Sequence, residues 1–143
     1  MAGQGRTMPI VDAALDYVLK HRPDDADCCV LWGDPTPSNT MWRPDGSVAA
    51  LIDWELAALG PSELDLAWWL YFDDLFSRRF GVTRLEGLPT RDETIALYEA
   101  ASGRKLRHLD YYDIVAALRM TLVAVGAFNR LVGQGVLPAR TKA

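Results

Sequence analysis

The sequence predicts an α+β domain that is predominantly α-helical, with a few short strands in its first half. Apolar residues recur at helical spacing near the start of the chain and through most of its second half. Short β-prone runs, bounded by Gly, Pro and Asp, lie between positions 28 and 53. The chain has 143 residues, half of them hydrophobic, which suffices for one core without disulfides. We therefore expect a single domain over residues 1–143.

The first expected element is an amphipathic helix. Its apolar side chains fall on one helical face, at Val11, Ala14, Leu15, Val18 and Leu19. Thr7 and Pro9 are start signals at one end of this face, and Pro23 is a stop signal at the other. A helix is therefore predicted ahead of Pro23.

Three short strands are expected next. The run Cys28–Trp32 is β-prone and ends abruptly, so this strand delivers Asp34 into a loop. Thr40–Arg43 and Val48–Asp53 are predicted to be two further strands, joined by a Pro-Asp-Gly-Ser sequence that suits a tight turn. The two form a small hairpin that ends at Asp53.

The second half is expected to be helical. After a turn at Gly60-Pro61, Ser62 and Asp65 have the spacing of a capping pair. The helix that they open, over positions 66–72, is apolar nearly all round, so we expect it to be deeply buried.

Two more helices are expected beyond it. Thr90 and Glu93 form a capping-box pattern before a helix that Gly103 closes. Asp110 is expected to cap the last and longest helix. The apolar stripe of that helix comprises Tyr111, Ile114, Val115, Leu118, Leu122 and Val125. Because no repeat, low-complexity segment or long linker interrupts the chain, nothing marks a second domain.

The charge balance argues against several classes of partner. The net charge is −4, from 19 acidic residues against 15 Lys and Arg. The chain therefore lacks the basic composition that nucleic acid or an anionic membrane surface would require, and we expect neither as a partner. A phosphate-bearing substrate would need a metal ion to offset the repulsion.

Two features favour a cytoplasmic location. Cys28 and Cys29 are the only cysteines, and adjacent residues of a strand point to opposite faces, so they cannot form an ordinary disulfide. Residues 1–9 contain no apolar h-region, and we expect no later apolar run to approach the ~20 residues that span a bilayer.

Acidic and amide side chains gather at predicted chain turns. Asp34 and Asn39 are five residues apart, which matches the spacing of a kinase catalytic loop, and Asp53 follows at the end of the hairpin. Phosphoryl transfer needs a carboxylate to deprotonate the acceptor and oxygen ligands for Mg²⁺. Taken singly, Asp34 and Asn39 could be ordinary turn residues, but their order and spacing together favour the catalytic interpretation.

This segment resembles the signature of the aminoglycoside phosphotransferase and choline-kinase-like family. The matching residues are Gly33-Asp34 with Asn39, then Ile52-Asp53-Trp54-Glu55, then Asp65-Leu66-Ala67. The resemblance runs from about Val11 to Val132 and implies the C-terminal lobe of a protein-kinase-like fold, with a small hairpin that carries the catalytic loop and the metal-binding Asp.

The resemblance also implies a role for each residue of the signature. Asp34 would be the catalytic base, and Asn39 and Asp53 would hold Mg²⁺ against the phosphates of ATP or GTP. Asp65 would brace the catalytic loop. Glu55 would either contact the groups that surround the metal ion, without binding the ion directly, or be a solvated or capping side chain. One departure is Trp32, which stands where the family most often has His; because an indole offers one donor and no acceptor, how the loop is held stays open.

The sequence contains no glycine-rich phosphate loop and no strand with a phosphate-binding lysine. Its lysines, Lys20, Lys105 and Lys142, lie at a helix end, in a loop and in the tail. We therefore expect the nucleotide lobe to be absent, either because the chain is a fragment or truncated product or because another polypeptide supplies that lobe. The isolated chain should then be a poor kinase, and self-association through the uncovered face is expected.

Three functions follow as alternatives. The first is transfer of a phosphoryl group from ATP or GTP to a hydroxyl of a small molecule, with the acceptor left open among aminoglycosides, choline, sugars and other alcohols. The second is a non-catalytic remnant that binds a ligand or a protein. The third, hydrolysis at a two-metal site, needs more ligands than the sequence offers. Asp73 and Asp74 could attract a cationic acceptor, although adjacent acids usually form a solvated face, and Trp68 is assigned to the core.

Overall fold

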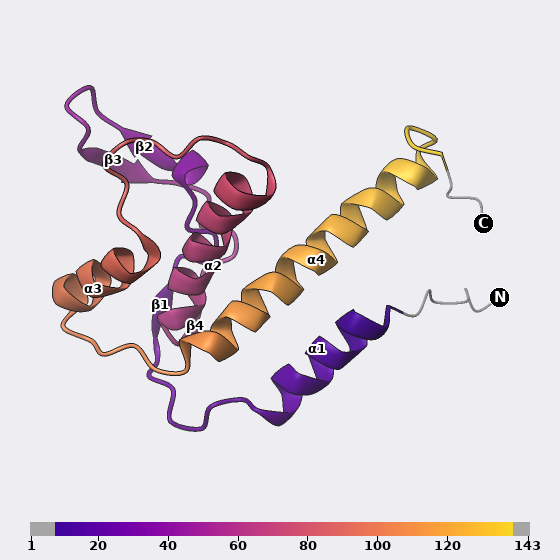
Figure 1. Cartoon of the computed structure of the whole chain (residues 1–143), viewed down its shortest axis with the longest axis horizontal. Helices are drawn as coiled ribbons and strands as arrows, with labels where there is room; N and C mark the ends of the chain where they lie inside the picture. Colours follow the sequence, from indigo (N-terminus) through magenta and orange to yellow (C-terminus); the bar gives the residue numbers. More distant parts are fainter. Residues whose placement is uncertain (1–7, 139–143) are drawn as a thin grey trace.

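The computed structural model describes residues 8–138. Figure 1 shows a helix-rich domain in which α2 (Glu63–Asp74) lies between the strand-bearing segment and the long helix α4 (Leu109–Gly133). Helix α4 packs against α2 over its first half and also against α1 (Pro9–Lys20). This arrangement confirms the predicted α+β, predominantly helical class.

Helix α1 has a proline in its first turn and ends at Lys20, as the sequence predicted. Its inward face meets the core through Val18, whose carbonyl oxygen accepts a hydrogen bond of 3.1 Å from the Tyr111 hydroxyl. The predicted start signal Thr7 lies outside the described residues.

The strands form two antiparallel pairs. The predicted hairpin is confirmed as β2 (Thr40–Trp42) and β3 (Val48–Leu51). The predicted first strand is confirmed as β1 (Cys29–Leu31), which pairs with β4 (Ala58–Gly60). The sequence did not reveal β4, and it placed Gly60 in a turn, which was wrong. Three residues are too few for a periodic signal, so only the partner strand defines β4. Within the described part of the chain, both cysteines are free thiols.

Helix α2 supplies the centre of the core, and its predicted burial is confirmed for Leu66, Ala67, Trp68 and Leu70. The core cluster consists of Ala67, Trp68, Tyr111, Tyr112 and Ala116. The predicted capping pair at its start was wrong, because in residues 8–138 no side-chain hydrogen bond from Ser62 caps the helix. Asp65 instead accepts hydrogen bonds from the start of the loop that carries Asp34. The helix continues into a π-helical turn, η2 (Leu75–Arg79).

The start and end signals predicted for α3 are present, whereas the start predicted for the last helix, α4, is displaced. Helix α3 (Arg91–Ser102) begins with the complete Thr90–Glu93 capping box and ends at Gly103 in the left-handed conformation, which confirms both signals. Helix α4 begins one residue before Asp110, so that His108 occupies the cap position and the predicted Asp110 cap was wrong.

Helix α4 contradicts the expectation that no apolar run in the chain approaches the length of a membrane span. It has 25 residues and is long and apolar enough to cross a membrane, by length and composition. The predicted stripe is buried at Tyr111 and Leu118, whereas Leu122 is 53% exposed. Since a long core helix meets the same criteria, this helix is only weak evidence for a membrane span.

Candidate active site

The loop that carries Asp34 is anchored to α2 by hydrogen bonds. The Asp65 carboxylate, in the first turn of that helix, accepts the backbone N–H of Trp32 at 2.7 Å and that of Gly33 at 3.0 Å. Gly33 has a φ of +88°, and a Cβ there would collide with the backbone of Leu56. The loop therefore leaves β1 along a path that only glycine permits.

Asp34 is half-buried and both of its carboxylate oxygens are held. Oδ2 accepts a 2.8 Å hydrogen bond from Asn39 Nδ2, which also donates to the Asp34 carbonyl oxygen at 3.1 Å. Oδ1 accepts a 2.7 Å hydrogen bond from the indole Nε1 of Trp68. The structure thus brings Asp34 and Asn39 together, and it gives Trp68 a contact that an assignment to the core alone did not anticipate.

The hairpin places Asn39 and Asp53 at the same end. Asn39 closes the short 3₁₀ helix η1 (Pro37–Asn39), and its carbonyl oxygen accepts the Ile52 N–H at 3.0 Å. The pairing of β2 with β3 begins next to this bond, at Thr40 and Leu51. Asp53 follows Ile52 directly, is exposed, and has a φ of +60°. A non-glycine residue in this region is strained, which is a feature of many functional sites.

Trp32, which stands where the family most often has His, holds the loop through its indole N–H. Its indole Nε1 donates a 2.8 Å hydrogen bond to the carbonyl oxygen of Ile52, the residue before Asp53. Its ring also lies 5.9 Å from that of Trp54, centroid to centroid. The single indole donor therefore ties the loop that carries Asp34 to the segment that presents Asp53. Glu55 is exposed in the turn that follows.

Arg119, on α4, is a site residue that sequence reasoning missed. Its guanidinium donates a 2.7 Å hydrogen bond to the Gly33 carbonyl oxygen, and its Cζ lies 4.0 Å from the centroid of the Trp68 ring. The available signal was an arginine in the apolar middle of the helix, next to the stripe residue Leu118. Such a charge is costly to bury without a partner.

The Asp65 carboxyl has a shifted pKa. Burial raises the pKa of this carboxyl, and the negative charge of Asp34 adds to the shift. The two backbone hydrogen bonds and the positive charge of Arg119 act in the opposite direction, but burial prevails. The two backbone hydrogen bonds make this partly buried carboxyl an anchor for the loop that carries Asp34.

The donor set suits a magnesium ion that is shared with a nucleotide. Because Nδ2 of Asn39 faces Asp34, its amide oxygen remains available, and Asp53 offers an exposed carboxylate. Among residues 8–138 no three His, Cys, Asp or Glu side chains cluster as a self-sufficient metal site. Mg²⁺ is commonly held by one or two protein oxygen ligands together with phosphates and water, so the residues present fit it.

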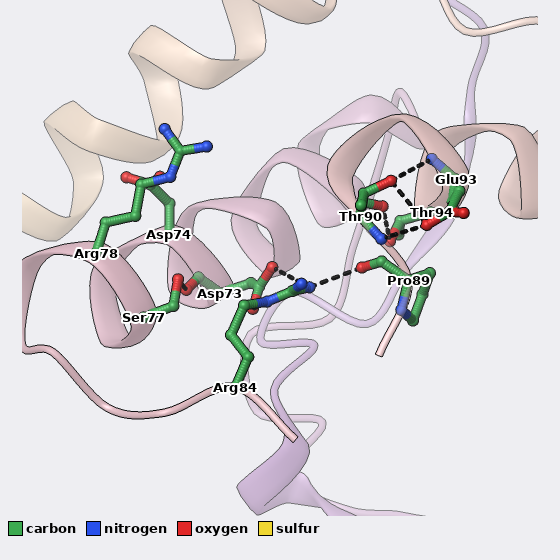
Figure 2. A network of polar contacts seen from close by, with 9 residues as sticks. All are labelled: Asp73, Asp74, Ser77, Arg78, Arg84, Pro89, Thr90, Glu93 and Thr94. Atoms are coloured by element: carbon green, nitrogen blue, oxygen red, sulfur yellow. Dashed lines mark hydrogen bonds and ion pairs between the residues drawn. The ribbon is translucent and has the colours of Figure 1, made fainter. Parts of the chain in front are cut away.

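A separate cavity of about 410 Å³ lies at the far end of α2. Asp73 forms two hydrogen bonds with Arg84, which also donates to the Pro89 carbonyl oxygen, and Asp74 pairs with Arg78 (Figure 2). Asp73 and Asp74 are therefore engaged by arginines rather than free to attract a cationic acceptor.

The fold, with the loop that carries Asp34, the hairpin and the buried anchoring helix, is the kinase-like fold of a phosphotransferase. Residues 5–103 match the model of the phosphotransferase enzyme family, and the chain belongs to that family. A crystal structure from Ralstonia eutropha, provisionally described as an aminoglycoside phosphotransferase, superposes with a TM-score of 0.77 at 24% identity. That alignment covers 91% of this chain and 42% of the Ralstonia chain.

Curated relatives are much longer proteins. Mouse acyl-CoA dehydrogenase family member 11 is 24% identical over 139 residues, which cover 90% of this chain and 18% of that protein. Mouse acyl-CoA dehydrogenase family member 10 is 26% identical over 144 residues, with 93% and 13% covered. The chain therefore spans less than a fifth of the length of these relatives.

Proposed function

We propose that this chain provides the catalytic-loop half of a site that transfers the γ-phosphoryl group of ATP or GTP to a hydroxyl group of a small molecule. The observation that carries the proposal is the 2.8 Å hydrogen bond between Asn39 Nδ2 and Asp34 Oδ2. It joins the two residues whose spacing is that of a kinase catalytic loop.

Asp34 acts as the base in this proposal. The donors Asn39 and Trp68 fix the plane of its carboxylate, and each oxygen keeps a further lone pair for an incoming hydroxyl. The acceptor hydroxyl gives its proton to Asp34 as its oxygen attacks the γ-phosphorus, while the bond from that phosphorus to the β–γ bridging oxygen breaks and ADP or GDP leaves. Holding the carboxylate in place beforehand removes the cost of orienting it during the reaction.

Asn39 and Asp53 would hold the metal ion. Asn39 would contribute its amide oxygen and Asp53 its carboxylate, both from the same end of the hairpin. When bound, Mg²⁺ neutralises negative charge on the β- and γ-phosphates. The bond from Trp32 to the Ile52 carbonyl oxygen keeps Asp53 in register with the catalytic loop.

Full activity in this proposal requires phosphate-binding groups from outside these 143 residues. The sequence contains no glycine-rich loop, and within residues 8–138 no lysine lies in a strand where it could hold the phosphates. Since positioning and electrostatic stabilisation provide most of kinase catalysis, the chain alone should turn over orders of magnitude more slowly than a complete enzyme.

Nucleotide titration followed by NMR tests the proposal without depending on turnover. Adding Mg²⁺ with ATP or GTP should shift the side-chain amide of Asn39 and the backbone amide of Asp53. Asp53→Ala should abolish the nucleotide-dependent shift of the Asn39 side-chain amide and that of the backbone amide at position 53. Asp45→Ala, which removes an equal charge from the opposite end of the same hairpin, should preserve the Asn39 shift.

The alternative is a non-catalytic binding module, and one observation favours it. Every residue from position 41 to 59 is exposed, including Trp42 and Trp54, so the hairpin presents an apolar surface beside Asp53. If nucleotide shifted neither Asn39 nor Asp53 in the unmodified chain, the phosphotransferase proposal would fail and this alternative would replace it.

A further inference from the structure

We infer that Arg119 and Trp68 form a positioning pair that orients the Asp34 carboxylate. The inference rests on the proposed role of Asp34 as the base. Arg119 comes from α4 and Trp68 from α2, so the pair connects the catalytic loop to both core helices.

Trp68 fixes one side of the carboxylate. Its side chain is 4% exposed, and its indole nitrogen donates to Asp34 Oδ1 at 2.7 Å. Hydrogen bonds to an ionised acceptor are shorter and stronger than neutral ones. With Asn39 Nδ2 on the other oxygen, the carboxylate is held at both ends and cannot rotate freely.

Arg119 fixes Trp68 and the loop together. Its guanidinium lies over the indole face, 4.0 Å from the ring centroid, and donates to the Gly33 carbonyl oxygen at 2.7 Å. A cation over an aromatic face is attracted by the ring, and it draws electron density away from the indole N–H. The N–H thereby becomes a better donor to Asp34.

Packing alone does not explain an arginine at this position. Leucine or methionine would fill the same space without the cost of removing a guanidinium from water. The positive charge has a specific use here, because Asp34 and Asp65 are two carboxylates on either side of Gly33. Arg119 reduces the repulsion between them while holding the peptide that joins Gly33 to Asp34.

The indole N–H signal of Trp68 reports on this arrangement directly, in the full chain and without turnover. Trp68→Phe identifies the signal among those of the five tryptophans. Asp34→Ala should move it upfield and accelerate its exchange with solvent by about tenfold or more. Arg119→Met should move it in the same direction, and Arg119→Lys, which keeps a cation and a donor, should restore it in part.

Arg130→Met provides the matched control, because it removes an exposed arginine from the far end of the same helix and should leave the signal unchanged. An unchanged Trp68 signal in Asp34→Ala, or equal signals in Arg119→Met and the unmodified chain, would overturn the inference. If Arg119→Met does not fold, the Asp34→Ala and Arg119→Lys spectra still decide it. The nucleotide-dependent shifts at Asn39 and Asp53 are measured separately, so failure of the proposed function is told apart from failure of this pair.

Discussion

The carboxylate of Asp65 accepts the backbone N–H of Trp32 at 2.7 Å, across 33 residues of sequence. Its second oxygen accepts the next N–H, that of Gly33, at 3.0 Å. One side chain at the start of α2 thus satisfies two consecutive donors that β1 leaves unpaired as it ends. This contact fixes the start of the loop that carries Asp34.

Replacing Asp65 by Ala should therefore lower the stability of the fold. Two partly buried N–H groups would lose their acceptor, at a cost of about 2–4 kcal/mol in the free energy of unfolding. Urea denaturation followed by circular dichroism measures this change. Asp110→Ala, in the exposed first turn of α4, should change stability by less than about 0.5 kcal/mol. Equal effects of the two substitutions would contradict the anchoring role.

Gly33→Ala should be more damaging than Gly46→Ala, although both glycines have a positive φ, of +88° and +82°. Both substitutions incur the strain of a left-handed alanine, about 1–2 kcal/mol. At position 33 the new Cβ would also lie 2.6 Å from the Leu56 carbonyl carbon, whereas at position 46 nothing lies within 4 Å. We expect a loss of more than about 3 kcal/mol for Gly33→Ala, measured by urea denaturation. Similar losses at both positions would show that the loop does not pass so close to Leu56.

Trp32→Phe should loosen the end of the hairpin without unfolding the domain. It removes the N–H that donates to the Ile52 carbonyl oxygen while keeping an aromatic ring, so about 1 kcal/mol should be lost. Hydrogen exchange should accelerate at the Ile52 amide, which is bonded to Asn39. Trp42→Phe, at an exposed position of β2, is the control and should leave this exchange rate unchanged. If Trp32→Phe also left it unchanged, the indole would not hold this segment.

The local motifs of this fold were accessible from the sequence because each depends on neighbouring residues. The spacing of Asp34 and Asn39 and the turn that joins β2 to β3 lie within short segments of chain. The Thr90–Glu93 capping box is equally local, and its side-chain and backbone groups bond as their spacing predicted. Short-range geometry leaves such patterns few alternatives.

Contacts between distant segments were not accessible in this way. Strand β4 exists because β1 offers it a partner, and Arg119 belongs to the site because α4 crosses Trp68. Ser62 has the spacing of a cap, but Asp65 accepts backbone N–H groups of the loop that carries Asp34 and leaves the capping motif unformed. In each case a tertiary contact decided the outcome, and a single sequence carries no periodic signal for it.

The predicted caps at Thr90 and Ser62 should differ in how much stability they lose on mutation to Ala. Thr90 accepts the Glu93 N–H at the start of α3, so Thr90→Ala should lower the free energy of unfolding by about 1 kcal/mol. Ser62→Ala should cost less than about 0.5 kcal/mol, because within the described chain its side chain does not cap α2. Thermal or urea unfolding of the two variants measures the difference. A larger loss at Ser62 than at Thr90 would contradict the capping geometry.

The Asp25 carboxylate should make the fold sensitive to acid. It bonds His108 Nε2 at 3.0 Å and Arg107 at 2.8 Å, which ties the segment after α1 to the start of α4. The hydrogen bond with His108, supported by the charge of Arg107, holds the pKa of Asp25 below its usual value of 3.8. Because the pKa is lower in the folded state, the carboxylate stabilises the fold above about pH 4, and this contribution is lost as the pH falls through the folded-state pKa.

Urea midpoints measured at about pH 7, 5 and 3 test this dependence. The midpoint should fall between about pH 4 and 3, and Asp25→Asn should lower it at neutral pH while reducing its fall in acid. Part of the fall should remain in the variant, because Thr90 also holds the pKa of Glu93 below its usual value. Asp24→Asn, at the exposed neighbouring position, should keep the full acid dependence. If Asp25→Asn and Asp24→Asn gave the same profile, the contact between Asp25 and His108 would not stabilise the fold.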